Sequence, residues 1–294
     1  MIDETLEAEF ALRKRHPERD MIYDQHKRRS AIVRAEGSCL LDQRYAAGPR
    51  CLLDIFPAGD GAPVLFFIHG GYWRALDKSY VSFIAEPFRS AGITVVAPGY
   101  DLVPSIRVGG IVDQMRLAFD WIVKRLAPPR IVVSGHSAGG QLAAMLALDQ
   151  AVQGGGPIVG LATISGAFDL RPLLHTSINA DLNLSAVEAA DASPLLRVKA
   201  LMDGAALVPL LGIVGGDETQ GFKQWTAELV AAWAARGAPA KVCEVAGRNH
   251  FTILDAIAAP DGDLSDRICK LALGSAGARL PHDAMKGPRM NDAG

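Results

Sequence analysis

The fold is decided by the stretch Ile131-Val132-Val133-Ser134-Gly135-His136-Ser137-Ala138-Gly139-Gly140. Its β-branched start is typical of a strand, and helix formers follow directly from Gln141. Between them stands Gly-x-Ser-x-Gly, the nucleophile elbow, in which a serine occupies a sharp strand-to-helix turn. The serine backbone is strained at such a turn, so it needs small neighbours, and Gly135 and Gly139 supply them. We therefore expect Ser137 to be a nucleophile and not merely the N-cap of a buried helix.

At 294 residues the chain could hold one large α/β domain or two small ones. We expect one, spanning residues 1–294, because strand-like and helix-like segments alternate throughout without a linker between them. Hydrophobic residues make up 49% of the 294 and can fill a sizeable core. The net charge of −2, without a basic stripe, argues against nucleic acid or a membrane as a partner, so we expect a small-molecule substrate. The four cysteines lack metal-ligand spacing, which predicts reduced thiols, no metal and no cofactor: Cys39, Cys51, Cys243 and Cys269. A disulfide between Cys39 and Cys51 is the alternative.

The expected compartment is the cytoplasm. The start of the chain, Met1–Glu7, is acidic and polar, unlike a signal peptide, and no apolar run reaches membrane-spanning length. The sequence leaves open whether two copies pair as a homodimer.

Strand-like and helix-like segments alternate along the chain, which predicts a mostly parallel central sheet with helices on both faces. Strands are expected at 39–45, 50–56, 63–68, 93–97, 130–134, 157–165, 207–215 and 241–245, and helices at 78–90, 106–126 and 220–236. Residues 1–35 predict a helical segment, broken near His16-Pro17, that could form part of a lid. Residues 167–205 exceed a simple crossover and predict a small helical cap, and residues 275–294 predict a loose tail.

A serine nucleophile requires a base, and His250 has the right position for it. It follows the last expected strand in Gly247-Arg248-Asn249-His250-Phe251, as the chain order serine, acid, histidine demands. His136 adjoins the nucleophile and faces away from the position of a base, which leaves it a role in substrate binding. His69 precedes two glycines and is expected to hold their loop.

The acid that orients the histidine should follow the expected strand at 207–215, where Gly215-Gly216-Asp217-Glu218 stands. Asp217 is our prediction for this role. Glu218 is its close rival and Asp255 a distant one. Asp217 could instead be the N-cap of the helix that begins near Gln220.

The oxyanion of the tetrahedral intermediate requires preorganised amides. We expect them from Ala138, directly after the nucleophile, and from the loop at Gly70 and Gly71, where glycine lets the backbone approach closely. Tyr72 and Trp73 follow in that loop and either line the substrate pocket or pack in the core.

His69-Gly70-Gly71-Tyr72-Trp73, taken with the serine turn and Asn249-His250-Phe251, resembles the α/β-hydrolases of the kynurenine formamidase (arylformamidase) type. The likeness runs from the N-terminal helices to about residue 273. It implies an α/β-hydrolase fold, a triad of Ser137, Asp217 and His250, and an oxyanion hole from Gly70, Gly71 and Ala138. It also implies hydrolysis of an N-formyl aryl amide, as in tryptophan catabolism, or of a related small ester.

The sequence thus predicts a metal-free serine hydrolase of small, aromatic amides or esters, with N-formylkynurenine as the leading substrate. A carboxylesterase or amidase of aromatic-compound catabolism is the nearest alternative. A non-catalytic ligand-binding protein of the same fold is the alternative from another class, although such proteins usually lose the serine, the histidine or the glycines that this chain retains.

Overall fold

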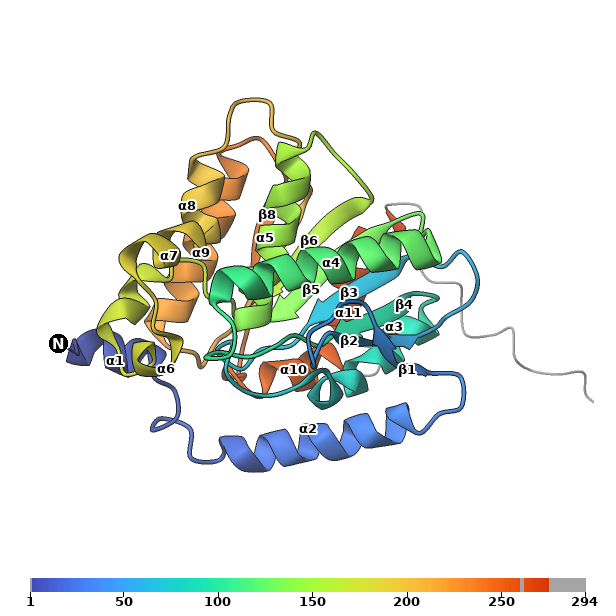
Figure 1. Cartoon of the computed structure of the whole chain (residues 1–294), viewed down its shortest axis with the longest axis horizontal. Coiled ribbons are helices and arrows are strands. Elements are labelled where there is room, and N and C mark those ends of the chain that lie inside the picture. The colour runs from blue at the N-terminus through green and yellow to red at the C-terminus, as the bar shows by residue number, and fades with distance from the viewer. Residues whose placement is uncertain (1, 260–261, 275–294) are drawn as a thin grey trace, which may run out of the picture.

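A computed structural model describes residues 2–259 and 262–274, so the loose tail expected at 275–294 lies outside the described residues. The described chain forms an eight-stranded sheet in the order β1-β2-β4-β3-β5-β6-β7-β8 (Figure 1). β1 and β2 form an antiparallel hairpin, β2 runs antiparallel to β4, and the remaining neighbours are parallel. The strands are Leu40–Arg44 (β1), Leu52–Phe56 (β2), Val64–Ile68 (β3), Thr94–Pro98 (β4), Ile131–His136 (β5), Ile158–Ile164 (β6), Leu210–Gly215 (β7) and Ala240–Val245 (β8).

Helices cover both faces of the sheet, as the alternation of elements predicts. The α-helices are Glu4–Phe10 (α1), Arg19–Arg34 (α2), Ala85–Ser90 (α3), Val108–Leu126 (α4), Ala138–Val152 (α5), Asn179–Leu182 (α6), Ala186–Asp191 (α7), Pro194–Lys199 (α8), Gln220–Ala234 (α9), Ile253–Ile257 (α10) and Asp263–Leu273 (α11). One apolar core lies between the sheet and α4, α5, α8 and α9, and a second lies against α3, α10 and α11. The central strands, such as β3 with sequence VLFFI, are therefore buried on both faces.

The expected helix over 78–90 is wrong in detail. The chain forms two 3₁₀ turns, Lys78–Tyr80 (η1) and Ser82–Ile84 (η2), before the short helix α3. Pro87 has no backbone N–H to donate to an earlier carbonyl, and its ring crowds the turn before it. An α-helix can therefore accommodate Pro87 only in its first turn, which is where α3 places it.

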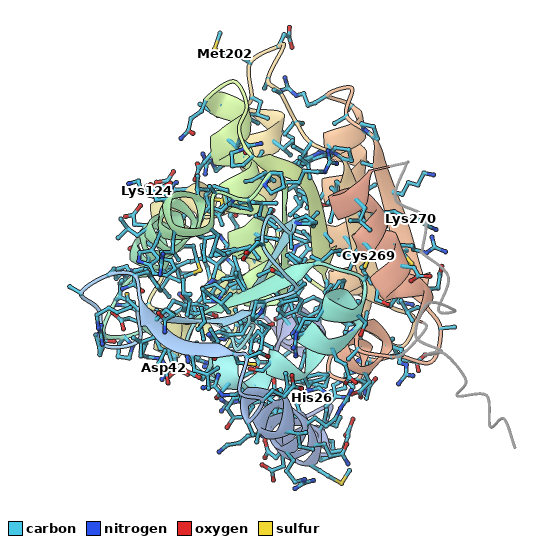
Figure 2. The ribbon with its side chains drawn as sticks, turned by 90° about the vertical axis from the view of Figure 1, so that its right-hand side faces the viewer. His26, Asp42, Lys124, Met202, Cys269 and Lys270 are labelled. Atoms are coloured by element: carbon cyan, nitrogen blue, oxygen red, sulfur yellow. The ribbon has the colours of Figure 1, made fainter. Side chains whose placement is uncertain are left out.

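The two N-terminal helices, α1 and α2, are attached to different parts of the fold. Phe10 of α1 stacks on Trp225 of α9 with ring centroids 4.1 Å apart. On α2, the Nε2 of His26 lies 3.1 Å from Asp255, and its ring stacks on Phe83. Figure 2 shows α2 at the base of the molecule, with the loop that carries exposed Met202 at the opposite end. The connection between α1 and α2 therefore passes over the carboxyl edge of the sheet.

Between β6 and β7 the chain makes a 3₁₀ turn, Arg171–His175 (η3), and the short helices α6, α7 and α8. A capping box begins α7, in which the Ser185 and Glu188 side chains each bond the other's backbone N–H. Of this segment, Ser177 and Ile178 reach the pocket described below.

The turn between β5 and α5 depends on the absence of side chains at its glycines. A Cβ on Gly135 would lie 2.2 Å from the carbonyl oxygen of Gly139, and a Cβ on Gly139 would lie 2.0 Å from that of Ile68 in β3. Because these neighbours are backbone atoms, they cannot move aside without displacing the strand. The close packing of α5 on the sheet therefore requires glycine at both positions.

Gly139→Ala is expected to lower the free energy of unfolding by about 4 kcal/mol or more, because the new methyl group collides with the β3 backbone. Gly109→Ala is the matched control, since a Cβ there meets nothing within 4 Å in the helix α4. That change should raise stability by about 0.5–1 kcal/mol through the alanine helix preference. Urea unfolding of both variants checks the pair, and equal stabilities would contradict the packing described.

Candidate active site

Ser137 stands at the apex of the turn between β5 and α5. Its backbone has φ 55° and ψ −119°, a left-handed conformation that a residue with a side chain rarely adopts. The side chain is 3% exposed and lines a pocket at the carboxyl edge of the sheet. The turn therefore presents the hydroxyl to a cavity and sets it at the N-terminus of α5, whose first amides have no partner inside the helix.

His250 lies at the same edge, in the loop between β8 and α10, and lines the same pocket. Its Nδ1 is 2.8 Å from Oε2 of Glu218. Because a carboxylate only accepts hydrogen bonds, Nδ1 donates to it and leaves Nε2 free of a proton. The ring is also held by Phe222, with centroids 4.5 Å apart. The imidazole thus presents its unprotonated nitrogen with one tautomer favoured.

The prediction of Asp217 as the partner of the histidine is wrong, because Glu218 makes that contact. Asp217 is exposed, whereas Glu218 is 7% exposed. The turn after β7 directs Glu218 inward, where its Oε1 accepts from the Gly215 amide at 2.7 Å and from the Ser165 hydroxyl at 2.5 Å. One carboxylate oxygen is therefore anchored below the strand end while the other holds His250.

Asp217 is not the N-cap of α9, and Asp255 is not the partner of His250. Thr219, not Asp217, occupies the N-cap position of α9. Asp255 lies beside His26 and Arg29 of α2, where it anchors that helix.

His136 positions the loop that carries His250. It is 5% exposed, and its Nε2 donates to the carbonyl oxygen of His250 at 2.8 Å. Burial, followed by the neighbouring His250, lowers the pKa of His136 well below its ordinary value. The imidazole therefore stays neutral. It also lines the pocket, as a substrate-binding residue would.

The glycine loop after β3 passes beside Ser137. A Cβ on Gly70 would lie 3.1 Å from the Ser137 Cβ, and Gly71 has φ 113°, which favours glycine. His69 donates through Nδ1 to the Gly70 carbonyl at 2.8 Å, and Tyr100 donates to the His69 carbonyl at 2.9 Å. These bonds hold the loop beside the serine, and Gly71 lines the same pocket as Ser137, while Ala138 is the first residue of α5.

The structure separates the two aromatic residues of this loop. Tyr72 lines the pocket, and its hydroxyl donates to the Phe10 carbonyl at 2.7 Å. Trp73 is fully buried and donates through Nε1 to Gln141 at 3.1 Å. The prediction of Trp73 as a substrate-binding residue is therefore wrong, because the left-handed backbone at both residues turns it into the core.

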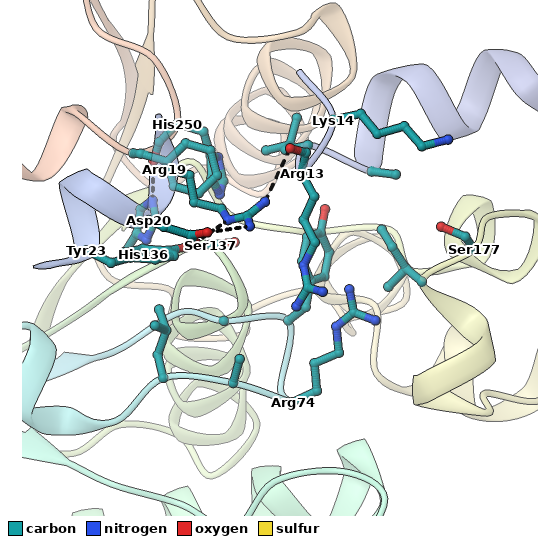
Figure 3. A pocket seen from close by; sticks show the side chains of 18 of the residues that line it. Arg13, Lys14, Arg19, Asp20, Tyr23, Arg74, His136, Ser137, Ser177 and His250 are labelled. Atoms are coloured by element: carbon teal, nitrogen blue, oxygen red, sulfur yellow. Dashed lines mark hydrogen bonds and ion pairs between the residues drawn. The ribbon is translucent and has the colours of Figure 1, made fainter. Parts of the chain in front are cut away.

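The pocket has a volume of about 460 Å³ (Figure 3). Ser137, His136 and His250 occupy one wall, and Tyr72, Leu12 and Phe251 contribute aromatic and apolar surface. The remaining wall comes largely from the N-terminal segment. The sequence predicts for this segment only a part in a lid and marks none of its residues as pocket-lining. The lining residues are Glu7, Ala11, Leu12, Arg13, Lys14, Arg19, Asp20 and Tyr23. This size suits a small aromatic molecule.

Among the described residues, no group of histidine, cysteine, aspartate or glutamate side chains could hold a metal ion. Within the same ranges, no helix is both long and apolar enough to cross a membrane.

Acid should destabilise the protein through His69. Burial lowers its pKa from 6.5 to about 4, so the unfolded chain takes up a proton below pH 6.5 that the folded protein refuses. The stabilising effect of keeping this histidine neutral is present above pH 6.5 and is lost as the pH falls. We expect the free energy of unfolding to drop by about 2 kcal/mol from this group between pH 7.5 and 5.

Chemical denaturation of His69→Gln across that range should show a flatter dependence than the wild type. His175→Gln, a change at an exposed histidine, is the control and should leave the slope unaltered. An identical slope in His69→Gln and the wild type would contradict the assignment.

Comparison with known proteins agrees with this fold. Residues 65–254 match a family model described as the alpha/beta hydrolase fold. A kynurenine formamidase of Salmo salar is 28% identical over 246 residues, covering 81% of this chain and 84% of that protein. A carboxylic ester hydrolase of Mycobacterium tuberculosis is 36% identical over 112 residues, 34% of this chain and 30% of that protein. The crystal structure of a putative thioesterase from Silicibacter sp. TM1040 superposes with a TM-score of 0.74 at 30% identity, covering 83% of this chain and 91% of that one.

Proposed function

Because the chain belongs to the α/β-hydrolase family, we propose that it is a serine hydrolase of small aromatic amides or esters, with N-formylkynurenine as the leading substrate. The observation that carries this proposal is that Ser137 and His250 line one pocket while Glu218 orients the histidine. Ser137 sits on a strained turn, His250 lines the same cavity, and Glu218 holds the imidazole. A non-catalytic ligand-binding protein would need neither a serine on a strained turn nor a histidine oriented by a buried carboxylate.

In the proposed acylation, Nε2 of His250 accepts the proton of the Ser137 hydroxyl while Oγ attacks the substrate carbonyl carbon. Glu218, hydrogen-bonded to Nδ1, stabilises the imidazolium that forms. The oxyanion accepts from the amides of Ala138 and of Gly71, with Gly70 in the same loop. Donors of this kind contribute about 3 kcal/mol each to stabilising the transition state.

The intermediate collapses when the C–N or C–O bond breaks and His250 gives its proton to the leaving amine or alcohol. In deacylation, water attacks the acyl-serine, His250 takes the proton of that water, and Ser137 regains its hydrogen as the acid leaves. For N-formylkynurenine, the balanced result is one water consumed and one formate, one proton and one kynurenine released.

Two observations favour a formamide. The relative from Salmo salar is a kynurenine formamidase and aligns over most of both chains. The aromatic part of the pocket, with Tyr72 and Phe251, would suit the aryl group. An esterase is the second candidate, because the Mycobacterium tuberculosis relative hydrolyses carboxylic esters by its name and matches about a third of this chain.

The test is a comparison of kcat/KM for N-formylkynurenine, N-acetylkynurenine and 4-nitrophenyl acetate with one protein preparation. A formamidase should prefer the formyl over the acetyl amide by at least about tenfold, since a small acyl site penalises an added methyl group. A faster ester and no preference between the amides would favour the esterase. If none of the three compounds were hydrolysed, the proposed function would be contradicted.

A further inference from the structure

The outer wall of the pocket carries more positive than negative side chains. Its basic residues are Arg13, Lys14, Arg19 and Arg74, and its acidic residues are Glu7 and Asp20. A pocket for an uncharged aromatic compound has no need of this excess of positive charge. The partners of each charged group decide whether any cation remains available to a ligand.

Both acidic groups are already engaged. Both carboxylate oxygens of Glu7 accept from Ser177, one from its amide at 2.7 Å and one from its hydroxyl at 2.6 Å. Asp20 is held by two nitrogens of Arg19, at 2.9 and 3.1 Å. Arg19 also donates to the Arg13 carbonyl oxygen, so its guanidinium is committed as well.

Arg13 differs from Arg19 because its guanidinium has no hydrogen-bond or ion-pair acceptor among the residues that the structure describes. Figure 3 shows the Arg13 side chain extending into the pocket toward that of Arg74. Arg74 pairs through Nη1 with Asp181 of α6, so that its Nε and Nη2 are not engaged by that carboxylate. Its side chain is 14% exposed, so its position is largely fixed by the surrounding protein.

Two guanidinium groups that face each other across a cavity repel unless an anion lies between them. Each offers several N–H donors in a planar fork that matches the two oxygens of a carboxylate. One of the pair, Arg74, is fixed on the glycine loop, and the other, Arg13, comes from the N-terminal segment. A carboxylate held by both would join the two walls of the pocket.

We propose that Arg13 and Arg74 bind a carboxylate of the substrate, so that the protein selects aromatic formamides or esters that carry an anionic group away from the scissile bond. The inference rests on the proposed function and deepens it by naming the charge that the substrate must bear. It assigns to the N-terminal segment a direct part in specificity, in addition to covering the site.

The test compares two inhibitors of one shape that differ in charge, 4-phenylbutanoate and its neutral amide 4-phenylbutanamide. Their inhibition constants are measured against hydrolysis of the uncharged reporter 4-nitrophenyl acetate. In the wild type, the carboxylate should bind about tenfold more tightly than the amide, because hydrogen bonds between charged groups are the strong ones. Arg13→Gln should remove most of that preference, and Arg13→Glu should reverse it.

Arg15→Gln is the matched control, since Arg15 is exposed on the same segment but does not line the pocket. It should keep the full preference. Arg74→Gln should lose the preference as Arg13→Gln does. Retention of the preference in either Arg13→Gln or Arg74→Gln, or its absence in the wild type, would overturn the proposal.

The two proposals can fail separately. If the wild type hydrolyses neither the reporter nor N-formylkynurenine, the proposed function fails, and calorimetric titration of the same protein with the two inhibitors still measures the charge preference. If the reporter is hydrolysed but charge makes no difference, only the carboxylate site is wrong. Raising NaCl from 0.05 to 0.5 M should shrink a genuine preference, because the Debye length falls to about 4 Å.

Discussion

Replacing Ser137 by alanine is expected to lower kcat by about six orders of magnitude. The alanine retains the turn, because its Cβ fits where the serine Cβ lies, but the acyl-enzyme can no longer form. The residual rate should be that of water attack assisted by the oxyanion amides alone. The measurement is kcat for 4-nitrophenyl acetate, with protein purified well enough to exclude traces of host esterases.

Ser134→Ala serves as the control for this experiment. Ser134 lies three residues earlier in β5, is buried, and donates to the Ala162 carbonyl oxygen at 2.7 Å. Its loss should cost stability of about 1 kcal/mol and leave kcat within a few-fold of the wild type. If Ser137→Ala kept a tenth or more of the activity, another residue would be the nucleophile.

Glu218→Gln is expected to lower kcat by about four orders of magnitude, as an amide does at the equivalent position of other triads. A glutamine can donate its NH₂ to Nδ1 of His250 and so favour the tautomer that carries the proton on Nε2. That nitrogen could then no longer accept the serine proton. The shape of the side chain is preserved, so the loss should appear in kcat with the fold intact by circular dichroism.

Asp217→Asn is the decisive companion to this variant. Because Asp217 is exposed while Glu218 is buried against His250, the change should leave kcat within about twofold. The opposite pattern, with Asp217→Asn inactive and Glu218→Gln active, would mean that the loop rearranges in the working enzyme. Both variants should be measured from pH 5 to 9, so that a shifted pH optimum is not mistaken for a lost residue.

Local signals in the sequence were sufficient to predict the serine turn. Gly135 and Gly139 flank Ser137, and the need for glycine at these two positions follows from the turn itself. The α/β class and the positions of the strands in the sequence also follow from hydrophobic runs separated by helices. The structure confirms the α/β-hydrolase fold. A pattern of this kind depends on neighbours in sequence, which can be read without a structure.

The acid could not be chosen in the same way. Asp217 and Glu218 are adjacent and chemically alike, and only the course of the turn decides which one points inward. The Ser165 hydroxyl and the Gly215 amide that fix Glu218 come from two different strand ends. Their convergence is a property of the assembled sheet, so spacing from the strand alone favoured the wrong neighbour.

The residues of the outer wall of the pocket could not be predicted from the sequence for a similar reason. Arg13 and Arg74 are 61 positions apart in the chain and line one pocket because α1 packs on α9 and α2 packs against α10. Trp73 shows the reverse case, an aromatic residue beside the site in sequence that the backbone turns into the core. The proposed selection of a substrate carboxylate thus depends on long-range packing, while the proposed reaction depends on short motifs.

Labelling with a fluorophosphonate followed by peptide mass spectrometry tests directly whether Ser137 is an activated nucleophile. An activated serine reacts with such a probe only when its base and oxyanion site are in place. The structure predicts one adduct per chain, on Ser137, formed at the wild-type rate in Asp217→Asn and much more slowly in Glu218→Gln. No adduct on the folded wild-type protein, or an adduct on a residue other than Ser137, would contradict the assignment of this site.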